Sequence, residues 1–232
     1  MKILVIIPAY NEALNIESVV DNIVQNYPQL DYIVVNDGSK DNTMDILKHR
    51  GYHYIDLPIN IGLHGAFQTG LKYASTKGYD AAIQFDGDGQ HNAEYILELS
   101  KNMEMANADV VIGSRFLNAK KSINPRMIGN TLLSFLIKLT TGRTITDPTS
   151  GMRMFRRNMI EEFAWNMNYG PEPDTIAYLI KNGAAVSEIQ VAMNERIAGE
   201  SYLTFARSIR YMMQMCISII FIQQFRKREG KK

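Results

Sequence analysis

The chain has only one cysteine, Cys216, among its 232 residues. A lone thiol cannot form a disulfide within the chain or build a thiolate zinc site, and it fits a reducing cytoplasm. The chain also lacks a large excess of positive or negative residues, because its formal net charge is +1 at pH 7. A nearly neutral chain argues against a nucleic-acid-binding module that works by bulk electrostatics. We therefore expect a cytoplasmic protein without a nucleic-acid partner.

Hydrophobic runs long enough to cross a membrane are also missing. The run from Ile3 to Ile7 is shorter than the about seven to fifteen apolar residues of a signal peptide, and Pro8 ends it. Near the C-terminus only fifteen residues lie between Arg210 and Arg226, short of the roughly twenty that span a bilayer. We expect the first run to be a buried strand and the second to be a short helix.

The C-terminal segment, residues 205–232, is predicted to form an apolar, amphipathic helix followed by the basic tail "RKREGKK". One hypothesis places this helix along the inner face of the plasma membrane, with the tail on anionic lipid. The alternatives are packing against its own domain or against a second copy of the chain, which would make a homo-oligomer. The sequence leaves these alternatives open.

Short apolar runs alternate with helical segments in the first half of the chain. The runs are "KILVII", "YIVV", "YHYID", "AAIQF" and "DVVIG", and helices are expected at 15–25, 41–49, 65–75 and 94–106. This alternation predicts an α/β fold with a mainly parallel sheet flanked by helices. Further helices are expected at 126–141, 158–165 and 174–181, with a loop and strand in "GRTITDPTSGMRMF" and an extended segment at 184–193. We expect one domain over residues 1–204.

Two carboxylates, Asp86 and Asp88, follow a buried strand in "IQFDGDGQH". A calcium loop of the EF-hand type would require Gly at His91 and Glu at Leu97, so that type of site is excluded. A solvent-exposed turn would also accommodate the pair. Ligands of open α/β sheets bind at strand ends, however, and two carboxylates there suit Mg²⁺ or Mn²⁺ bridging a substrate diphosphate. No P-loop or dinucleotide-binding motif is present.

Six motifs occur in order: "PAYNE", "NDGSKDNT", "NIGLHGAFQTGLKYA", "FDGDGQH", "IGSRF" and "TDPTSGMRMF". Together they resemble the inverting glycosyltransferases of the dolichol-phosphate-mannose-synthase-like group, within family 2 and the GT-A fold, over residues 3–201. The resemblance implies a metal-dependent hexosyltransferase that uses a nucleoside-diphosphate sugar as donor. The acceptor would be a polyprenyl phosphate or a membrane-associated glycan. Some relatives have long C-terminal transmembrane helices, and this chain has only a short apolar one.

The resemblance also implies roles for individual residues. Asp88 would be the principal metal ligand, with Asp86 and Gln90 as further ligands. Arg115 would contact a phosphate, and Asp147 would be either a general base or the organiser of its loop. The residues expected to bind substrate are Pro8, Ala9, Tyr10, Glu12, Asp37, Gly62, Asp86, Gln90, Arg126 and Arg196.

Several of these residues have plainer interpretations. Asp37 could instead cap a helix that begins near Asp41, and a surface ion pair would account for Arg126. His91 is expected to be exposed at the start of a helix. Glu172 and Asp174 are weaker candidates for the base, because acidic residues are also favoured at a helix N-terminus.

Two rival functions remain at this stage. A sugar nucleotidyltransferase shares a similar nucleotide-binding half, but it usually has a Gly-rich, Arg-containing loop where this chain has "PAYNE". A non-catalytic protein that binds sugar nucleotides is the second rival. The presence of both Asp86 and Asp88 beside Arg115 and Asp147 disfavours it.

Overall fold

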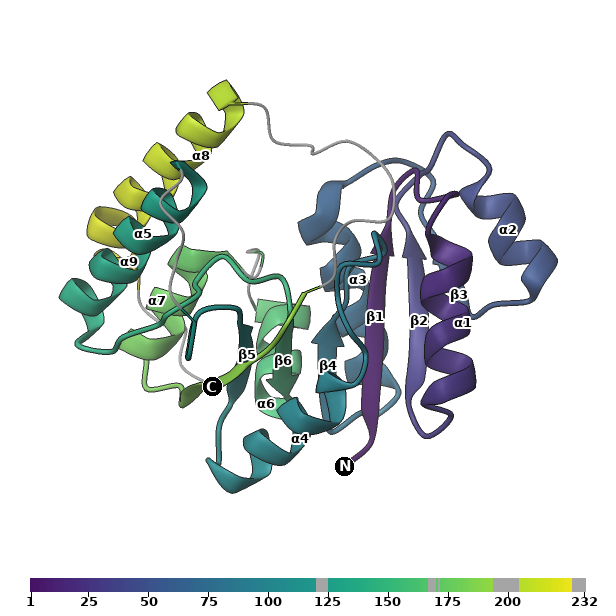
Figure 1. Ribbon diagram of the computed structural model, residues 1–232, viewed down its shortest axis with the longest axis horizontal. Helices are drawn as coiled ribbons and strands as arrows, with labels where there is room; N and C mark the ends of the chain where they lie inside the picture. Colours follow the sequence, from purple (N-terminus) through teal and green to yellow (C-terminus); the bar gives the residue numbers. More distant parts are fainter. Residues whose placement is uncertain (120–124, 167–169, 171, 194–204, 227–232) are drawn as a thin grey trace.

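The computed structural model describes residues 1–119, 125–166, 170, 172–193 and 205–226 (Figure 1). Its described strands form one seven-stranded sheet in the order β3-β2-β1-β4-β6-β5-β7. All pairs are parallel except those of β6, which runs antiparallel to both β4 and β5. The predicted α/β fold with a mainly parallel sheet is confirmed. The strands are β1 (Ile3–Ala9), β2 (Asp31–Asn36), β3 (Tyr54–Asp56), β4 (Ala81–Gln84), β5 (Val110–Ser114), β6 (Arg153–Arg156) and β7 (Val186–Gln190).

Helices cover both faces of this sheet. Successive side chains of a strand point to opposite faces, so Leu4 and Ile6 of β1 join one hydrophobic cluster while Val5 and Ile7 join the other. The continuous apolar run of β1 is therefore explained by burial on two sides. The helices are α1 (Ile16–Asn26), α2 (Thr43–Arg50), α3 (Gly62–Thr76), α4 (Tyr95–Met105), α5 (Pro125–Thr141), α6 (Arg157–Glu161), α7 (Pro173–Lys181), α8 (Phe205–Ile217) and α9 (Gln223–Phe225), with π-helical turns η1 (Glu162–Asn166) and η2 (Ser218–Ile222).

The sheet gathers the polar motifs at one edge. Strand β1 is parallel to both β2 and β4, and β4 and β5 are both antiparallel to β6. The carboxyl ends of β1, β2, β4 and β5 therefore point the same way. The order changes direction at β1, which lies between β2 and β4. In open α/β sheets a ligand binds outside the carboxyl ends of the strands near such a switch point. The loops that follow these four strands contain the motifs singled out above.

The C-terminal helices pack on the rest of the chain. In Figure 1, α8 lies along α5; η2 contacts α5 and α7, and α9 contacts α7. The buried carboxylate of Asp174 on α7 accepts hydrogen bonds from Ser218 Oγ at 2.6 Å and from Gln223 Nε2 at 3.1 Å. Ile219 is fully buried in the same contact. In the part of the chain that the structure describes, no helix is long and apolar enough to cross a membrane.

Candidate active site

The loop after β4 holds Asp86 through a buried histidine. The backbone N–H of Asp86 donates to His91 Nδ1 at 2.9 Å, and His91 Nε2 lies 3.5 Å from Asp86 Oδ2. Gln84 Nε2 donates to the other carboxylate oxygen at 3.2 Å. The expectation of an exposed His91 is wrong, because its side chain is only 2% exposed and packs edge-on against Phe85. His91 therefore fixes both the backbone and the carboxylate of Asp86.

Asp88 lies deeper in the same loop. It is buried, and its Oδ1 accepts the backbone N–H of Gln90 at 3.1 Å. Gly87 separates the two aspartates, and a Cβ at that position would lie 3.3 Å from the carbonyl oxygen of Pro8. The glycine thus permits the loop to lie against the "PAYNE" motif. A second glycine, Gly89, has a left-handed φ of 79°.

The donor set of this loop suits a metal ion that is shared with a ligand. Among the described residues, no group of three or more His, Cys, Asp or Glu side chains is arranged to hold a metal alone. Mg²⁺ and Mn²⁺ are nevertheless commonly bound through one or two carboxylates, with phosphate oxygens and waters as the other ligands. Asp86 and Asp88 fit that pattern, since two hard oxygen donors stand one residue apart at a strand end.

The loops after β1 and β2 are bound to each other. Asn11 has a left-handed φ of 58°, and its Oδ1 accepts the backbone N–H of Lys40 at 2.8 Å. The backbone N–H of Glu12 donates to Thr43 Oγ1 at 2.9 Å. Pro8 and Ala9 are the last residues of β1, and both are buried. Tyr10 is half-buried at the start of the loop, which leaves part of its ring accessible.

Asp37, at the end of β2, is fully engaged with the chain. Its two carboxylate oxygens accept the backbone N–H groups of Ile61 at 2.7 Å and Gly62 at 2.9 Å. The residue is 2% exposed. The alternative that Asp37 caps the helix near Asp41 is wrong, because it caps the N-terminus of α3 instead. Its predicted contact with the nucleobase stays a prediction.

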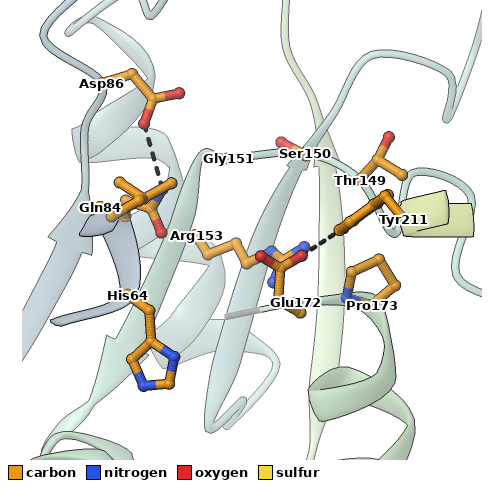
Figure 2. A pocket seen from close by; sticks show the side chains of 11 residues that line it. His64, Gln84, Asp86, Thr149, Ser150, Gly151, Arg153, Glu172, Pro173 and Tyr211 are labelled. Carbon is orange, nitrogen blue, oxygen red and sulfur yellow. Dashed lines mark hydrogen bonds between the residues drawn. The ribbon is translucent and has the colours of Figure 1, made fainter. Parts of the chain in front are cut away.

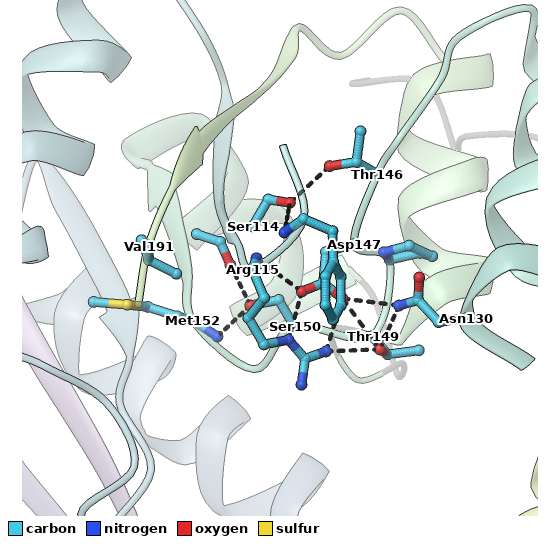
Figure 3. Close-up of polar contacts among 12 residues, drawn as sticks. Ser114, Arg115, Asn130, Thr146, Asp147, Thr149, Ser150, Met152 and Val191 are labelled. Carbon is cyan, nitrogen blue, oxygen red and sulfur yellow. Dashed lines mark hydrogen bonds and ion pairs between the residues drawn. The ribbon is translucent and has the colours of Figure 1, made fainter. Parts of the chain in front are cut away.

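Arg115, after β5, forms a bidentate pair with Asp147 (Figure 3). Arg115 Nε donates to Asp147 Oδ2 at 2.6 Å, and Nη2 donates to Oδ1 at 2.8 Å. The backbone N–H of Arg115 also donates to Oδ2, and Asn130 of α5 donates to Oδ1. Thr149 accepts from both Arg115 and Asn130. This network ties the loop 144–151 to β5 and α5.

The environment of Asp147 favours the ionised carboxylate. The residue is 0% exposed. Burial alone raises the pKa of its carboxyl, but the hydrogen bonds and positive charge of Arg115 outweigh that effect and hold the pKa below its usual value. Glu188 of β7 supports the same loop by accepting the backbone N–H groups of Thr146 and Asp147. Both oxygens of Asp147 are thus occupied within the chain.

A cavity of about 210 Å³ opens beside Asp86 (Figure 2). Two of its polar side chains, Gln84 and Arg153, come from β4 and β6 in the centre of the sheet, and others come from the start of α7 and from α8. Burial lowers the pKa of His64, which forms part of the wall. Most of these residues were not predicted to belong to the site, because the sequences "SGMRMF" and "AAIQF" do not indicate which side chains face a cavity. The lining residues are Leu63, His64, Gln84, Asp86, Thr149, Ser150, Gly151, Arg153, Glu172, Pro173 and Tyr211.

The structure brings most, but not all, of the predicted residues to one edge of the sheet. Asp86, Asp88 and Gln90 share one loop, and Arg115 and Asp147 share one network. Arg126 is part of α5, but its side chain lies outside the described structure. Arg196 also lies outside the described residues. Gly62 begins α3 with a left-handed φ of 83° and contacts Asp37.

Comparisons with known proteins agree with this geometry. The model of the family described as Glycosyl transferase family 2 matches residues 4–163. A UDP-N-acetylglucosamine–dolichyl-phosphate N-acetylglucosaminyltransferase from Methanococcus voltae is 36% identical over 179 residues, which are 68% of this chain and 71% of that protein. An undecaprenyl-phosphate mannosyltransferase from Micrococcus luteus is 28% identical and covers 88% of each chain.

Solved structures share the fold. The glucosyl-3-phosphoglycerate synthase of Mycobacterium tuberculosis, crystallised with Mn²⁺, UDP and phosphoglyceric acid, superimposes with a TM-score of 0.69. The match covers 99% of this chain and 80% of the synthase at 16% sequence identity. At that identity the likeness establishes the architecture of the sheet and its helices.

Proposed function

The chain belongs to glycosyl transferase family 2 and is a glycosyltransferase of the GT-A fold, and on that premise we propose its donor, acceptor and place of action. The enzyme transfers a sugar from a nucleoside-diphosphate sugar to a polyprenyl phosphate, with inversion at the anomeric carbon. The observation that supports this most directly is the pair Asp86 and Asp88 at the carboxyl end of β4, beside a cavity. Family membership also removes the nucleotidyltransferase and the non-catalytic binding protein as rivals.

The carboxylates of the loop after β4 would act on the leaving diphosphate through a bound cation. An oxygen of the acceptor forms the new bond to the anomeric carbon while the bond to the diphosphate breaks, so negative charge grows on the diphosphate. A divalent cation, Mg²⁺ or Mn²⁺, would neutralise that charge when bound by Asp88 with Asp86. The Mn²⁺ and UDP in the structure of the glucosyl-3-phosphoglycerate synthase support this assignment. Gln90, two residues from Asp88 in the same loop, would be a further ligand.

Arg115 is suited to a phosphate contact. Asp147 and Thr149 occupy its Nε and Nη2, so the guanidinium plane is fixed. Among the described residues no bond is formed by Nη1, which is the group left to meet a phosphate oxygen. About a quarter of the side chain is exposed, 26%. An arginine held in one orientation by a buried carboxylate loses little entropy when it binds an anion.

The state of Asp147 favours a phosphate acceptor. A general base must reach the proton that it removes, and it must be able to take that proton up. Asp147 is enclosed, and both of its oxygens already accept hydrogen bonds. A polyprenyl phosphate already has an ionised oxygen at neutral pH, so its attack requires no base at this position. We therefore assign Asp147 to the positioning of Arg115.

The surface of two helices supports action at a membrane. Large apolar side chains are exposed along one side of α5, spaced as on a single helix face, and along α8, η2 and α9. The two helices lie side by side at one end of the molecule (Figure 1). Clusters of exposed apolar residues on this scale mark interaction surfaces. We call this surface the apolar face, and its residues are Ile128, Leu132, Phe135, Leu139, Ile209, Met213, Ile217, Ile220, Phe221, Ile222 and Phe225.

We infer that the apolar face lies on the cytoplasmic leaflet, where a polyprenyl phosphate presents its headgroup. The tail "RKREGKK" follows this face in the sequence and has five basic residues against one acidic. Each basic residue contributes about 1 kcal/mol near an anionic membrane. A lipid-phosphate acceptor and a lipid-facing surface on the same enzyme are consistent with each other. Dolichyl phosphate and undecaprenyl phosphate, in the names of the two relatives described above, support a lipid-phosphate acceptor.

The test is a transfer assay with the full chain and lipid vesicles. Vesicles contain polyprenyl phosphate, and the donors are UDP-N-acetylglucosamine, UDP-glucose and GDP-mannose, each with Mn²⁺, with Mg²⁺ or with chelator. The expected result is a lipid product with the mass of polyprenyl phosphate plus one sugar, formed with release of a nucleoside diphosphate and only when metal is present. A parallel reaction contains a soluble oligosaccharide as acceptor: transfer to it and not to the lipid would assign a glycan acceptor, and no transfer with any donor would contradict the proposal.

A further inference from the structure

The cavity beside Asp86 contains a buried arginine whose hydrogen-bonding capacity is mostly unused. Arg153 of β6 is 2% exposed, and its Nη2 donates to the carbonyl oxygen of Pro148 at 2.6 Å. Its Nε and Nη1 have no hydrogen-bond partner among the described residues. A buried guanidinium group with two unpartnered nitrogens is costly and calls for an explanation, and a ligand that completes the bonds supplies one. Arg153 is one of the residues that line the cavity (Figure 2).

The neighbour of Arg153 across the sheet is an unsatisfied acceptor. Gln84 of β4 is the register partner of Arg153 in the antiparallel pair, so both side chains project from the same face. The amide of Gln84 donates through Nε2 to Asp86, and its Oε1 is buried without a partner. One cavity thus offers buried donors on Arg153 and a buried acceptor on Gln84.

A carboxylate adds further acceptors at the far side of the cavity. Glu172 precedes α7 and accepts the hydroxyl hydrogen of Tyr211, which comes from α8. Figure 2 shows the Glu172 carboxylate beside the Arg153 guanidinium, and their charges interact. The hydroxyl of Tyr211 stays protonated, because burial and the charge of Glu172 raise its pKa. The C-terminal helix therefore supplies one wall of the cavity.

The chemistry of these groups selects the ligand. An ionised phosphate offers only acceptors, so it would bond to Arg153 but would meet repulsion from Glu172 and Asp86. A sugar hydroxyl both donates and accepts, so it can satisfy the guanidinium, the carboxylates and the Gln84 oxygen together. The volume of about 210 Å³ is below the 300–1,000 Å³ of pockets for drug-sized ligands and is of the size for one ring.

We propose that Gln84, Arg153 and Glu172 bind hydroxyl groups of the sugar that is transferred, and so determine which donor sugar the enzyme accepts. The inference rests on the proposed function, because it takes the ligand of Asp86 and Asp88 to be a nucleoside-diphosphate sugar. The cavity adjoins Asp86, so a sugar in it would be continuous with a diphosphate at the metal-binding loop. Tyr211 orients Glu172 for this contact.

The inference is tested by comparing two ligands that differ only by the sugar. The full chain and Arg153→Met are titrated, with Mn²⁺, with UDP and UDP-glucose, UDP and UDP-N-acetylglucosamine, and GDP and GDP-mannose. Methionine keeps much of the volume and removes every N–H donor. The expected result is at least a tenfold weaker affinity of Arg153→Met for the nucleotide sugar that the parent prefers. Its affinity for the corresponding nucleoside diphosphate should stay within twofold of the parent's.

A matched control removes another arginine from the same strand. Arg156 donates to the carbonyl oxygens of Ala108 and Met103 and does not line the cavity. Arg156→Met should leave both affinities unchanged. The melting temperatures of both variants are measured alongside, to show that each is folded under the conditions of the titration.

Glu172→Gln provides a second variant in case Arg153→Met does not fold. Its amide can still accept from Tyr211 but loses the charge, and selective weakening of sugar-nucleotide binding is again expected. Equal affinities for the nucleotide sugar in parent and folded variants would overturn the inference, and so would equal weakening of both ligands. A parent chain that binds no nucleotide at all would instead refute the proposed function.

Discussion

At the scale of single residues, the site is built from side chains that hold other side chains. His91 and Gln84 hold Asp86, and Asp147 holds Arg115. Asp86, Asp88, Gln90 and Arg115 are the residues proposed to face the donor's diphosphate or its metal. The supporting residues matter because a group that is fixed before binding loses less entropy on binding.

The metal-binding role is tested most directly at Asp88. Asp88→Asn removes one negative ligand, so we expect a loss of about 10²-fold or more in turnover, equivalent to a few kcal/mol of transition-state stabilisation. The fold should persist, since Asp88 lies in a loop after β4. Turnover and thermal unfolding are measured at several Mn²⁺ concentrations. Undiminished turnover with an unchanged metal requirement would show that Asp88 is not a ligand.

The position of Asp86 depends on a glycine from a distant loop. A Cβ at Gly151 would lie 2.8 Å from Asp86 Oδ2, closer than real Cβ contacts, so Gly151→Ala must displace the carboxylate. We expect a higher Mn²⁺ concentration for half-maximal activity. Gly129→Ala is the control, because its Cβ would contact only the flexible Met212 side chain, at 3.1 Å. The same metal dependence in both variants would contradict this role of Gly151.

The Asp147 carboxyl gives a prediction for acid stability. Its pKa is lower in the folded state than in the unfolded chain, where it is about 3.9. The unfolded state therefore binds the proton first as pH falls. The stabilisation is complete above the unfolded pKa and is lost as pH falls through the folded value.

The measurement is the melting temperature of the parent and Asp147→Asn between pH 2.5 and 7. The parent should melt higher than the variant at neutral pH, and the difference should shrink below about pH 4. Asp21→Asn is a comparison at a partly exposed carboxyl: hydrogen bonds from Tyr52 and Arg50 also lower the pKa of Asp21, so a difference of the same sign is expected there. A difference between parent and Asp147→Asn that is the same at every pH would contradict the assignment of a buried anion.

At the scale of elements, apolar periodicity predicted most of the fold, and tertiary contacts decided the rest. The continuous runs of β1, β2 and β5 predicted buried parallel strands, because both of their faces are covered. The direction of β6 could not be predicted, because "MRMF" has the same pattern in either direction. The burial of His91 and Arg153 could not be predicted either, because burial depends on contacts between segments that are distant in the sequence. Gln84 and Arg153, for example, are register partners although they are more than 60 positions apart.

The exposed row on α5 was not anticipated, although its spacing is visible in the sequence. The row Ile128, Leu132, Phe135 and Leu139 repeats every three or four residues, as does the buried row that contains Leu133 and Ile137. A helix that is apolar on two sides has two partners. One is the core of this domain, and the proposed other is the membrane.

The apolar face is tested by substitution within folded protein. Phe135→Ser with Leu139→Ser should weaken flotation with anionic liposomes, because about 1.5–3 kcal/mol of apolar burial is lost per side chain. Leu14→Ser is the control, since Leu14 is exposed but belongs to the loop before α1. Equal flotation of all forms would exclude this face as the membrane contact. A double variant that changes only the oligomeric state would show that the face binds a second copy.

At the scale of the whole molecule, the C-terminal helices and the sheet are one packed unit. Asp174 is bonded to Ser218 and Gln223, and Ile219 is buried against the same cluster as the residues of α3 and α5. Tyr211 reaches from α8 to the cavity beside Asp86. An enzyme arranged in this way has its proposed membrane-facing helix and its proposed sugar-binding wall on one element, so attachment and donor binding are structurally connected.

A chain that ends at residue 204 is therefore expected to be destabilised, and not merely released from lipid. Truncation would leave the Asp174 carboxylate without Ser218 and Gln223, and it would expose apolar surface that Ile219 now covers. A buried acceptor that loses its donors costs about 1–3 kcal/mol, and an uncovered core residue costs a similar amount. Denaturant unfolding of the two forms measures the loss, with Asp174→Asn in the full chain as a milder comparison. If the truncated form unfolds at the parent's midpoint and keeps the parent's preference among nucleotide sugars, then residues 1–204 fold independently and Tyr211 has no part in sugar binding.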